Sequence, residues 1–390
     1  MLGLRETTAP STRPLAGKTA PASPWKGNAP GLYRRTGGGG NDRRGPSLPG
    51  SEPARTSPTA SVVGGGGAQR CREFPVLGYI IQYPNLRDHA RKSSWPMKPP
   101  RYVAPLTVAE AARVLAEEGE GAYALAGGTD LVVRMRNGTV RPTVLVDLQR
   151  IPDLAVIARQ DGHLRIGAMT TIAALIGSAE VRHLTPVAAE AGAQMGAVQL
   201  RNLATVGGNL ASAVPSADLA PPLLVLDAVA RIAGPAAART LPLEDLFVGP
   251  HRSALRQDEV LTAVDIPLPV AGTGAAFLKF GRRRAQVLAV VNAASWVRLQ
   301  QGIIAEVRIA LGAAAPTPMR ARAAEDLLRG QKADPDRLDA AAVVAAQETK
   351  PISDLRASAD FRRQLSRVLV RRALERAVQR ADREELRHAV

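Results

Sequence analysis

The pattern of apolar and polar positions along the chain changes abruptly near residue 97. From residue 105 onward, runs with helical spacing alternate with short runs that have the period of two typical of strands. Residues 105–122 predict a helix, because Thr107 and Glu110 have the spacing of a capping box and Gly119 provides a stop. Before residue 97, neither period is sustained.

Short strands follow this helix. The runs at 122–126 and 143–148 predict strands, and the first leads through two glycines into a second predicted helix that begins near Asp130. Residues 155–169 predict two strands joined at an Asp-Gly pair, which is typical of a tight hairpin turn. Helices and strands mix in this way in α+β proteins. A doubly wound dinucleotide-binding fold is disfavoured, because no GxGxxG motif follows the first strand.

The last patterned stretch, residues 348–377, again has helical spacing. Its closing part carries the apolar residues Phe361, Leu365, Val368, Leu369 and Ala373. This spacing predicts an amphipathic helix that packs on the rest of the chain through one face.

Residues 1–97 form a basic segment rich in Pro, Gly and Ser, and we expect this segment to be disordered. Residues 1–96 hold 14 Lys and Arg against 5 Asp and Glu, in a chain whose net charge is +16. Without periodic apolar residues the segment cannot bury enough surface to offset the entropy of ordering. A nucleic-acid-binding tail, a targeting peptide and sequence upstream of a translation start at Met97 all remain open. The abrupt change of pattern favours the last.

Two polar loops with paired glycines are the candidate binding sites. The first, AGGTD at 126–130, lies between a predicted strand and a predicted helix, where glycines let backbone N–H groups converge on an anion. The second, TVGGN at 205–209, is followed by Asp218 near the next helix. One such loop is more often a plain turn, but two predict a single extended ligand with several phosphates. Asp218 either begins its helix or accepts hydrogen bonds from ribose hydroxyls.

Other kinds of site are not indicated. The single cysteine, Cys71, excludes an internal disulfide and any four-cysteine cluster within this chain. The five histidines show no metal-binding spacing, so we expect no metal ligand and no catalytic side chain. Apolar runs stop short of the ~18 residues of a membrane span, and no apolar leader is present. We therefore expect a cytoplasmic protein with no membrane span and no nucleic-acid partner.

Five motifs in order carry a family resemblance. They are LAGGTDLVVRMRNG, LRIGAMTTIAAL, LRNLATVGGNLASAVPSADLAPPLLVLDA, FVGPHRSALRQDEVLTAVDIPLP and FLKFGRRRAQVLAVVNAA. Over about residues 102–380 the chain resembles the FAD-binding (medium) subunit of the molybdenum hydroxylases, the xanthine dehydrogenase, carbon monoxide dehydrogenase and hydroxybenzoyl-CoA reductase type. The resemblance implies an α+β fold. A two-subdomain FAD-binding fold of the PCMH or vanillyl-alcohol-oxidase-like type is expected at 98–272, divided at about 153/154, and a small α/β C-terminal domain at 273–390.

The resemblance also implies a site and partners. Non-covalently bound FAD is expected to exchange electrons between iron–sulfur centres of a partner and a soluble acceptor. Molybdopterin and [2Fe-2S] clusters are expected on a large and a small partner subunit, in a dimer of heterotrimers. The FAD-binding positions carried over from the family are Leu125, Ala126, Gly127, Gly128, Thr129, Asp130, Leu131, Met195, Thr205, Val206, Gly207, Gly208, Asn209, Asp218, Leu261 and Lys279.

Two other classes of protein remain open. A stand-alone flavin oxidase of the vanillyl-alcohol-oxidase-like fold usually needs a large substrate domain lined with aromatic residues, and Phe, Tyr and Trp make up only 3% of this chain. A non-enzymatic protein that binds nucleic acid through the basic tail would leave the glycine loops unexplained. Flavin content would separate the three interpretations.

Overall fold

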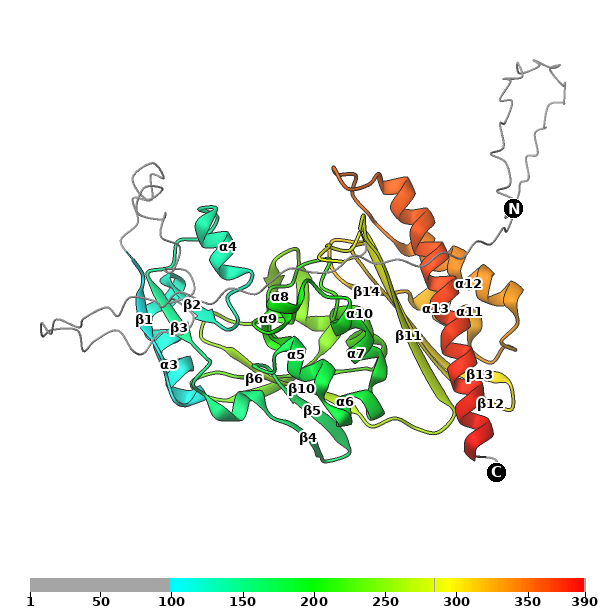
Figure 1. Ribbon diagram of the computed structural model, residues 1–390, viewed down its shortest axis with the longest axis horizontal. Helices are drawn as coiled ribbons and strands as arrows, with labels where there is room; N and C mark the ends of the chain where they lie inside the picture. The colour runs from blue at the N-terminus through cyan, green and yellow to red at the C-terminus, as the bar shows by residue number, and fades with distance from the viewer. Residues whose placement is uncertain (1–98, 284, 389–390) are drawn as a thin grey trace, which may run out of the picture. The chain divides into compact units, whose positions relative to one another are not determined.

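A small parallel sheet opens the part of the chain that the structure describes, residues 99–388 without residue 284. In this computed structural model the sheet has the strand order β1-β3-β2, formed by β1 (Arg101–Val103), β2 (Ala122–Leu125) and β3 (Val144–Asp147) (Figure 1). Helices α3 (Val108–Glu118) and α4 (Leu131–Arg136) and the single turn η1 (Gly119–Gly121) connect these strands. The expectations of disorder in residues 1–97 and of a translation start at Met97 lie outside the described residues.

The predicted boundaries of the first helix are confirmed. Thr107 Oγ1 accepts a hydrogen bond from the Glu110 amide at 3.1 Å, and a Glu110 carboxylate oxygen accepts one from the Leu106 amide at 3.0 Å. Gly119 ends α3 with a φ of 58°, a conformation that glycine adopts without strain. The buried face of the helix consists of Ala111, Ala112, Val114 and Leu115.

A five-stranded antiparallel sheet forms the second subdomain. Its order is β4-β5-β10-β6-β7, with β4 (Ile157–Gln160), β5 (His163–Gly167), β6 (Val229–Ala233), β7 (Ala238–Pro242) and β10 (Val260–Pro267). The predicted Asp-Gly turn between β4 and β5 is confirmed, because Asp161 and Gly162 have φ values of 50° and 74°. Helices and short elements complete the subdomain: η2 (Pro152–Ala155), α5 (Ile172–Gly177), α6 (Ala179–Leu184), α7 (Pro186–Ala193), α8 (Val198–Arg201), α9 (Val206–Ala211), α10 (Ala220–Val225), η3 (Leu243–Leu246), β8 (Phe247–Gly249) and β9 (Arg252–Ser253).

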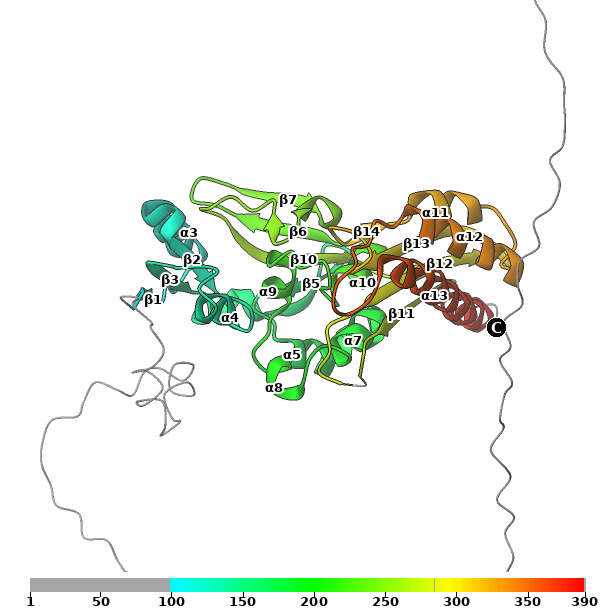
Figure 2. The same ribbon diagram turned by 90° about the horizontal axis from the view of Figure 1, so that it is seen from above.

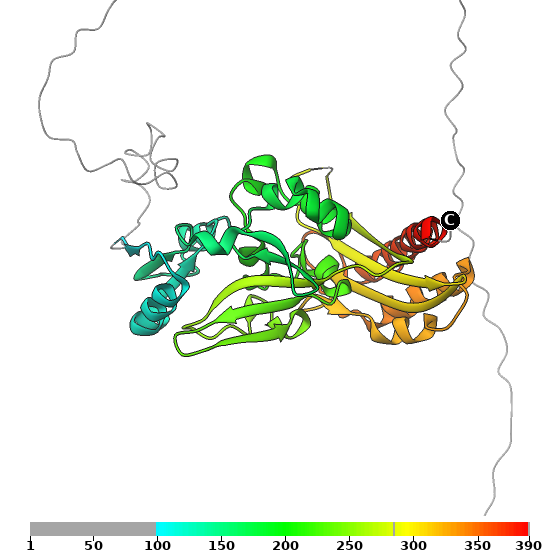
Figure 3. The ribbon, with the colours of Figure 1, turned by 90° about the horizontal axis from the view of Figure 1, so that it is seen from below.

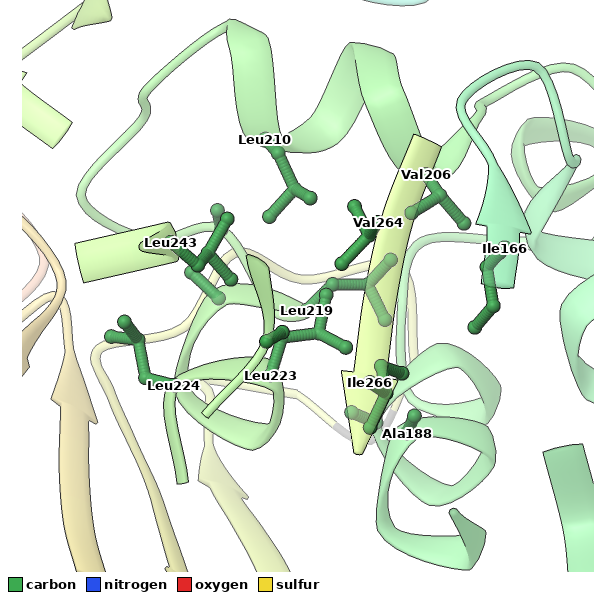
Figure 4. Packing of buried hydrophobic residues seen from close by; sticks show 14 of the residues in the cluster. Ile166, Ala188, Val206, Leu210, Leu219, Leu223, Leu224, Leu243, Val264 and Ile266 are labelled. Carbon is green, nitrogen blue, oxygen red and sulfur yellow. The ribbon is translucent and has the colours of Figure 1, made fainter. Parts of the chain in front are cut away.

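The main hydrophobic core lies between this sheet and its helices (Figure 4). This core contains Ile166 of β5, Ile266 of β10, Leu210 of α9 and Leu223 of α10, and all four are at most 2% exposed. Burying a side chain of this size stabilises the folded state by about 1.5–3 kcal/mol. The core therefore fixes the start of α9, which carries the second glycine loop.

A four-stranded antiparallel sheet begins the C-terminal domain, with the order β11-β12-β13-β14. Its strands are β11 (Thr273–Phe280), β12 (Val291–Gln300), β13 (Ile303–Gly312) and β14 (Met319–Arg320). Helices α11 (Arg322–Leu328), α12 (Pro335–Glu348) and α13 (Ala359–His388) lie on the side of this sheet away from α7 and α10 (Figures 2 and 3). The sheet is therefore buried between two layers of helices.

Strand β12 shows the consequence of burial on two faces. Ala293, Val297 and Leu299 join the core under the C-terminal helices, whereas the alternate residues Ala294 and Trp296 join the main core. Successive side chains of a strand point to opposite faces, so both faces must be apolar here. The strand ties the C-terminal domain to the second subdomain.

Helix α13 only partly matches the amphipathic helix predicted from the sequence. Leu369 and Ala373 are buried as expected, whereas Phe361 and Val368 are 43% and 40% exposed. The expectation that all five apolar positions share the packed face is wrong, because β11 and β12 cover only one side of the helix. Within residues 99–388, apart from residue 284, no helix is long and apolar enough to cross a membrane.

The contact between β11 and α13 brings two backbones together at Gly274. A Cβ atom on Gly274 would lie 2.1 Å from the Ala377 carbonyl oxygen and 2.4 Å from the Ala381 nitrogen. We therefore expect Gly274→Ala to lower the free energy of unfolding by about 1–3 kcal/mol, as overpacking does elsewhere. Urea unfolding measures this change. Gly177→Ala is the matched control, because no atom lies within 4 Å of its Cβ position; equal stability of the two variants would contradict the prediction.

Candidate functional site

A cavity of about 500 Å³ brings the two glycine loops together. This volume is within the range of roughly 300–1,000 Å³ that is usual for ligand-binding pockets. The first loop, at 126–130, lies between β2 and α4, and the second, at 205–209, forms the start of α9. Residues 286–288, in the connection between β11 and β12, complete the wall. The two subdomains and the C-terminal domain therefore each contribute a segment to the same cavity.

Most of the residues predicted to contact FAD line this cavity. They are Ala126, Gly127, Gly128, Thr129, Asp130, Leu131, Met195, Thr205, Gly207, Gly208, Asn209, Asp218 and Leu261. Leu125, Val206 and Lys279 do not line it. Further lining residues that sequence reasoning missed include Tyr123, Arg134, Leu200, Leu255, Glu259, Val287 and Leu288. Several of these lie inside the family motifs, but nothing in the motifs distinguishes them from their neighbours.

Leu125 and Val206 are buried instead. Leu125 is 5% exposed, and its carbonyl oxygen accepts a hydrogen bond from the Leu148 amide at 3.0 Å. Val206 is 1% exposed in the main core, and its amide donates to the Thr170 carbonyl oxygen at 2.9 Å (Figure 4). Neither residue is part of the cavity wall, and FAD contact at these two positions stays a prediction. They hold their loops in place.

The first glycine loop offers free backbone donors. The amides of residues 127–130 donate no hydrogen bond to any residue in the described part of the chain. Gly128 has a φ of 68°, and a Cβ on Gly127 would lie 1.8 Å from the Leu203 carbonyl oxygen, so both positions require glycine. Adjacent N–H groups that are free and lie at a cavity form a site for an anion.

The two glycine amides of the second loop, unlike those of the first, are already bonded. The Gly207 amide donates to the Ala168 carbonyl oxygen at 2.8 Å, and the Gly208 amide donates to Thr205 Oγ1 at 3.0 Å. A Cβ on Gly207 would lie 2.6 Å from the Ala168 Cβ, so close packing against the end of β5 excludes a side chain. At its glycines this loop therefore contributes a wall without side chains, followed by the Asn209 side chain, whereas the row of adjacent free amides belongs to the first loop.

Asp218 lies on the cavity wall in a buried ion pair. One carboxylate oxygen is 2.6 Å from Lys279 Nζ, and the other accepts a hydrogen bond from Asn292 Nδ2 at 3.0 Å. Burial raises the pKa of the Asp218 carboxyl, and the Lys279 ammonium opposes this shift. The alternative in which Asp218 begins its helix is wrong, because α10 begins at Ala220 and has no side-chain cap.

Lys279 acts on the cavity indirectly. Besides Asp218, its Nζ donates to the Gln194 carbonyl oxygen at 3.1 Å, and the next residue, Met195, lines the cavity. The Lys279 side chain is only 3% exposed. Its charge therefore positions Asp218 and the Met195 backbone.

Comparisons with known proteins agree with this architecture. The family model for the FAD binding domain in molybdopterin dehydrogenase matches residues 96–269, and the model for the CO dehydrogenase flavoprotein C-terminal domain matches residues 276–377. The chain belongs to this family of molybdopterin dehydrogenase flavoproteins. The resemblance, the FAD-binding α+β fold and the assignment to the oxidoreductases are thereby confirmed.

Individual relatives of the family are similar over nearly their whole length. The xanthine dehydrogenase FAD-binding subunit of Escherichia coli O157:H7 is 33% identical, over 70% of this chain and 94% of the relative. The carbon monoxide dehydrogenase medium chain of Afipia carboxidovorans is 36% identical, over 72% and 97%. A structure of carbon monoxide dehydrogenase from Hydrogenophaga pseudoflava matches with a TM-score of 0.71 and 36% identity, over 73% of this chain and 99% of that chain.

In this flavoprotein, Glu259 fixes a further part of the cavity wall. Arg239 donates two hydrogen bonds of 2.8 Å to its carboxylate, and the Arg256 amide donates one of 2.7 Å. These bonds hold the pKa of Glu259 below its usual range, and those from Arg239 have the largest effect. Nearby, Gln257 Nε2 donates to the Gly119 and Ala122 carbonyl oxygens at 2.9 and 2.8 Å. This segment joins the two subdomains beside the cavity.

We expect Glu259→Gln to destabilise the protein in a pH-dependent way. A carboxyl whose pKa is lowered by folding stabilises the protein above its unfolded pKa, near 4.3, and this contribution is lost as the pH falls through the folded pKa. The variant should be about 3 kcal/mol less stable at pH 7, because Arg239 is left without its partner. The difference should shrink below pH ~4. Chemical unfolding across this pH range measures it.

Glu117→Gln is the control for this experiment. Glu117 pairs with Arg113 on the exposed surface of α3, so its loss should change the unfolding free energy by less than about 0.5 kcal/mol. A difference between wild type and Glu259→Gln that stays constant from pH 7 to pH 3 would show that the charge of Glu259 does not matter.

Proposed function

We propose that this chain is the FAD-carrying electron-transfer subunit of a multi-subunit molybdenum hydroxylase. In this role it exchanges electrons between iron–sulfur centres of a partner chain and a soluble acceptor, while the substrate reacts at molybdenum on another chain. The observation that carries the proposal is the row of free amides at 127–130, set in a cavity shared by both subdomains and the C-terminal domain. Family membership supports it.

The lining residues fit the parts of FAD. The free amides of residues 127–130 suit the diphosphate, and the Asp218 carboxylate suits the hydroxyls of the adenosine ribose. The apolar side chains of Leu200, Leu255 and Leu288 suit a flavin ring. When bound, FAD supplies the ability to take up electrons in pairs and to release them singly. The chain itself supplies the binding groups and the apolar side chains around them.

The charges of the cavity explain why backbone donors matter. Among the described residues that line the cavity, Arg134 is the only cation, and it lies 3.8 Å from the Asp130 carboxylate, which offsets its charge. Asp218 and Glu259 add two more carboxylates, each already paired with a cation. A diphosphate in this cavity would therefore be stabilised mainly by N–H dipoles, which are fixed by the fold and need no mobile side chain.

The names of the relatives support an assembly with partner chains. Relatives are described as medium chains, as a medium subunit and as a subunit of a dehydrogenase complex. We propose a molybdopterin-binding large subunit and a [2Fe-2S] small subunit, assembled with this chain as a dimer of heterotrimers. A stand-alone flavin oxidase is the second candidate, and the nature of the flavin bond decides between them.

Absorbance of the purified full chain tests the proposed function. We expect a flavin band that passes into the supernatant on acid precipitation, with FAD as the released species. Flavin retained in the precipitate would favour an oxidase with covalent flavin. A preparation without flavin that also fails to take up added FAD would overturn the proposal.

A pair of glycine variants tests the first loop. Gly128 and Gly138 flank α4 with φ values of 68° and 71°, so alanine should cost each a similar ~1–2 kcal/mol of backbone strain. Only Gly128 lines the cavity. We expect Gly128→Ala to weaken FAD binding at least tenfold, because relief of the strain moves the free amides, and Gly138→Ala to change it less than twofold. Titration of the apoprotein with FAD measures both, and equal losses would contradict the assignment of this loop.

Asp218→Ala tests ribose recognition. Only FAD carries an adenosine ribose, so we expect the variant to lose at least tenfold in affinity for FAD and much less for FMN. Because the change also leaves Lys279 without its carboxylate, the unfolding temperature is measured in parallel. Equal losses for FAD and FMN would assign Asp218 to the framework of the cavity alone.

A further inference from the structure

Leu355 is fully exposed at the apex of the turn Asp354–Ala357, between α12 and α13. Ile352, three residues earlier, is 67% exposed, and Phe361, in the first turn of α13, is 43% exposed. The ring of Phe361 meets that of Phe280, at the end of β11, with 6.0 Å between the centroids. Single exposed apolar residues are common, but a group on adjoining segments marks an interaction site. We name Phe280, Ile352, Leu355 and Phe361 the Leu355 patch.

The fold holds the Leu355 turn rigidly. The Asp354 amide donates to the Ala357 carbonyl oxygen at 3.0 Å, and Asp354 Oδ1 accepts from the Arg356 amide and from the Arg362 guanidinium, both at 2.8 Å. Arg362 is 3% exposed and also donates to the Val290 carbonyl oxygen at 2.7 Å. These bonds of Nη1 and Nη2 offset part of the cost of burying the guanidinium, whose Nε has no partner among the described residues. The turn is thus fixed from beneath while its apical leucine stays uncovered.

The Leu355 patch adjoins the wall of the cavity. Arg282 donates from its guanidinium to the Leu355 carbonyl oxygen at 3.2 Å. It belongs to the connection between β11 and β12, which lines the cavity with residues 286–288 and is closed by a 2.8 Å hydrogen bond from the Val290 amide to the Phe280 carbonyl oxygen. A protein seated on the patch would therefore touch the same connection that encloses the cavity.

The charges around the patch indicate what kind of surface covers it. In the described residues of the segments that form the patch, five exposed cations stand against the two carboxylates of Asp354 and Asp360, which pair with Arg356 and Arg363: Arg282, Arg283, Lys350, Arg356 and Arg363. A second copy of this chain would bring these cations against one another, which is unfavourable. A different surface with an acidic edge would complement them.

We propose that the Leu355 patch docks another protein chain of the complex, which presents an apolar socket edged by Asp and Glu side chains. This inference rests on the proposed function in one respect: the docked chain is a member of the complex proposed there. A central apolar anchor within a charged rim is the usual form of a strong contact between proteins. The rigid turn adds to affinity, because little conformational entropy is lost when it binds.

The test is assembly of the full chain, carrying FAD, with the molybdopterin-binding and iron–sulfur chains encoded for the same complex. We expect Leu355→Glu to weaken assembly at least 30-fold, about 2 kcal/mol. Its flavin content and unfolding temperature should equal those of the wild type, because a fully exposed side chain contributes little to the folded state. Val270→Glu is the control: Val270 is 57% exposed and lies in the connection before β11, at the other end of that strand from Phe280.

Two further measurements identify the partner surface. Arg356→Glu should slow association and reduce its dependence on salt, since rim charges act mainly on the rate of encounter. A benzophenone amino acid in place of Leu355 should crosslink to one of the two partner chains. Crosslinking to a second copy of this chain, or binding of the wild type to vesicles of anionic phospholipid that Leu355→Glu abolishes, would overturn the proposal.

The outcomes separate this inference from the proposed function. If the isolated chain carries releasable FAD but Leu355→Glu assembles as well as the wild type, only the docking inference fails. If the chain takes up no flavin, the proposed function fails. If the wild type carries FAD but does not assemble with these chains, both the subunit role and the docking site are wrong.

Discussion

The buried ion pair between Asp218 and Lys279 is the interaction on which the cavity depends. Removing two charges from water costs several kcal/mol for each ion, and only their attraction and further hydrogen bonds offset that cost. Here Asn292 satisfies the second carboxylate oxygen, and the Gln194 carbonyl oxygen accepts from the ammonium. The pair therefore joins β11 and β12 of the C-terminal domain to the wall formed by the second subdomain. The cavity is built around the contact that holds these parts together.

The two glycine loops have similar sequences, but their glycines are needed for different physical reasons. In the first loop a positive φ at Gly128 and the close approach of the Leu203 carbonyl to Gly127 leave adjacent amides unbonded. In the second loop the glycine at 207 allows α9 to pack on Ala168, and the Gly207 and Gly208 amides are already bonded. One loop thus offers donors and the other offers a surface without side chains. An extended anionic ligand needs both kinds of wall.

The connection between β11 and β12 relates the cavity to the surface of the molecule. Val287 and Leu288 line the cavity, while Arg282 and Val290 bond to the Leu355 turn and to Arg362. The segment is short, and its two ends are held by the hydrogen bond between Phe280 and Val290. A protein that contacts the turn would therefore touch the same connection that lines the cavity.

The sequence by itself determined the features that depend on residues close together in the chain. The capping of α3 by Thr107, the turn at Asp161 and the place of the first glycine loop between a strand and a helix were predicted correctly, because neighbours within four residues decide them. The ordered motifs also predicted the family and its two-part fold. Only the tertiary structure decided which amides of the loops stay free, that Asp218 pairs with Lys279 61 residues away, and that Phe361 lies exposed. These features depend on which distant segments cover a group, and that information lies in the packing of the whole chain.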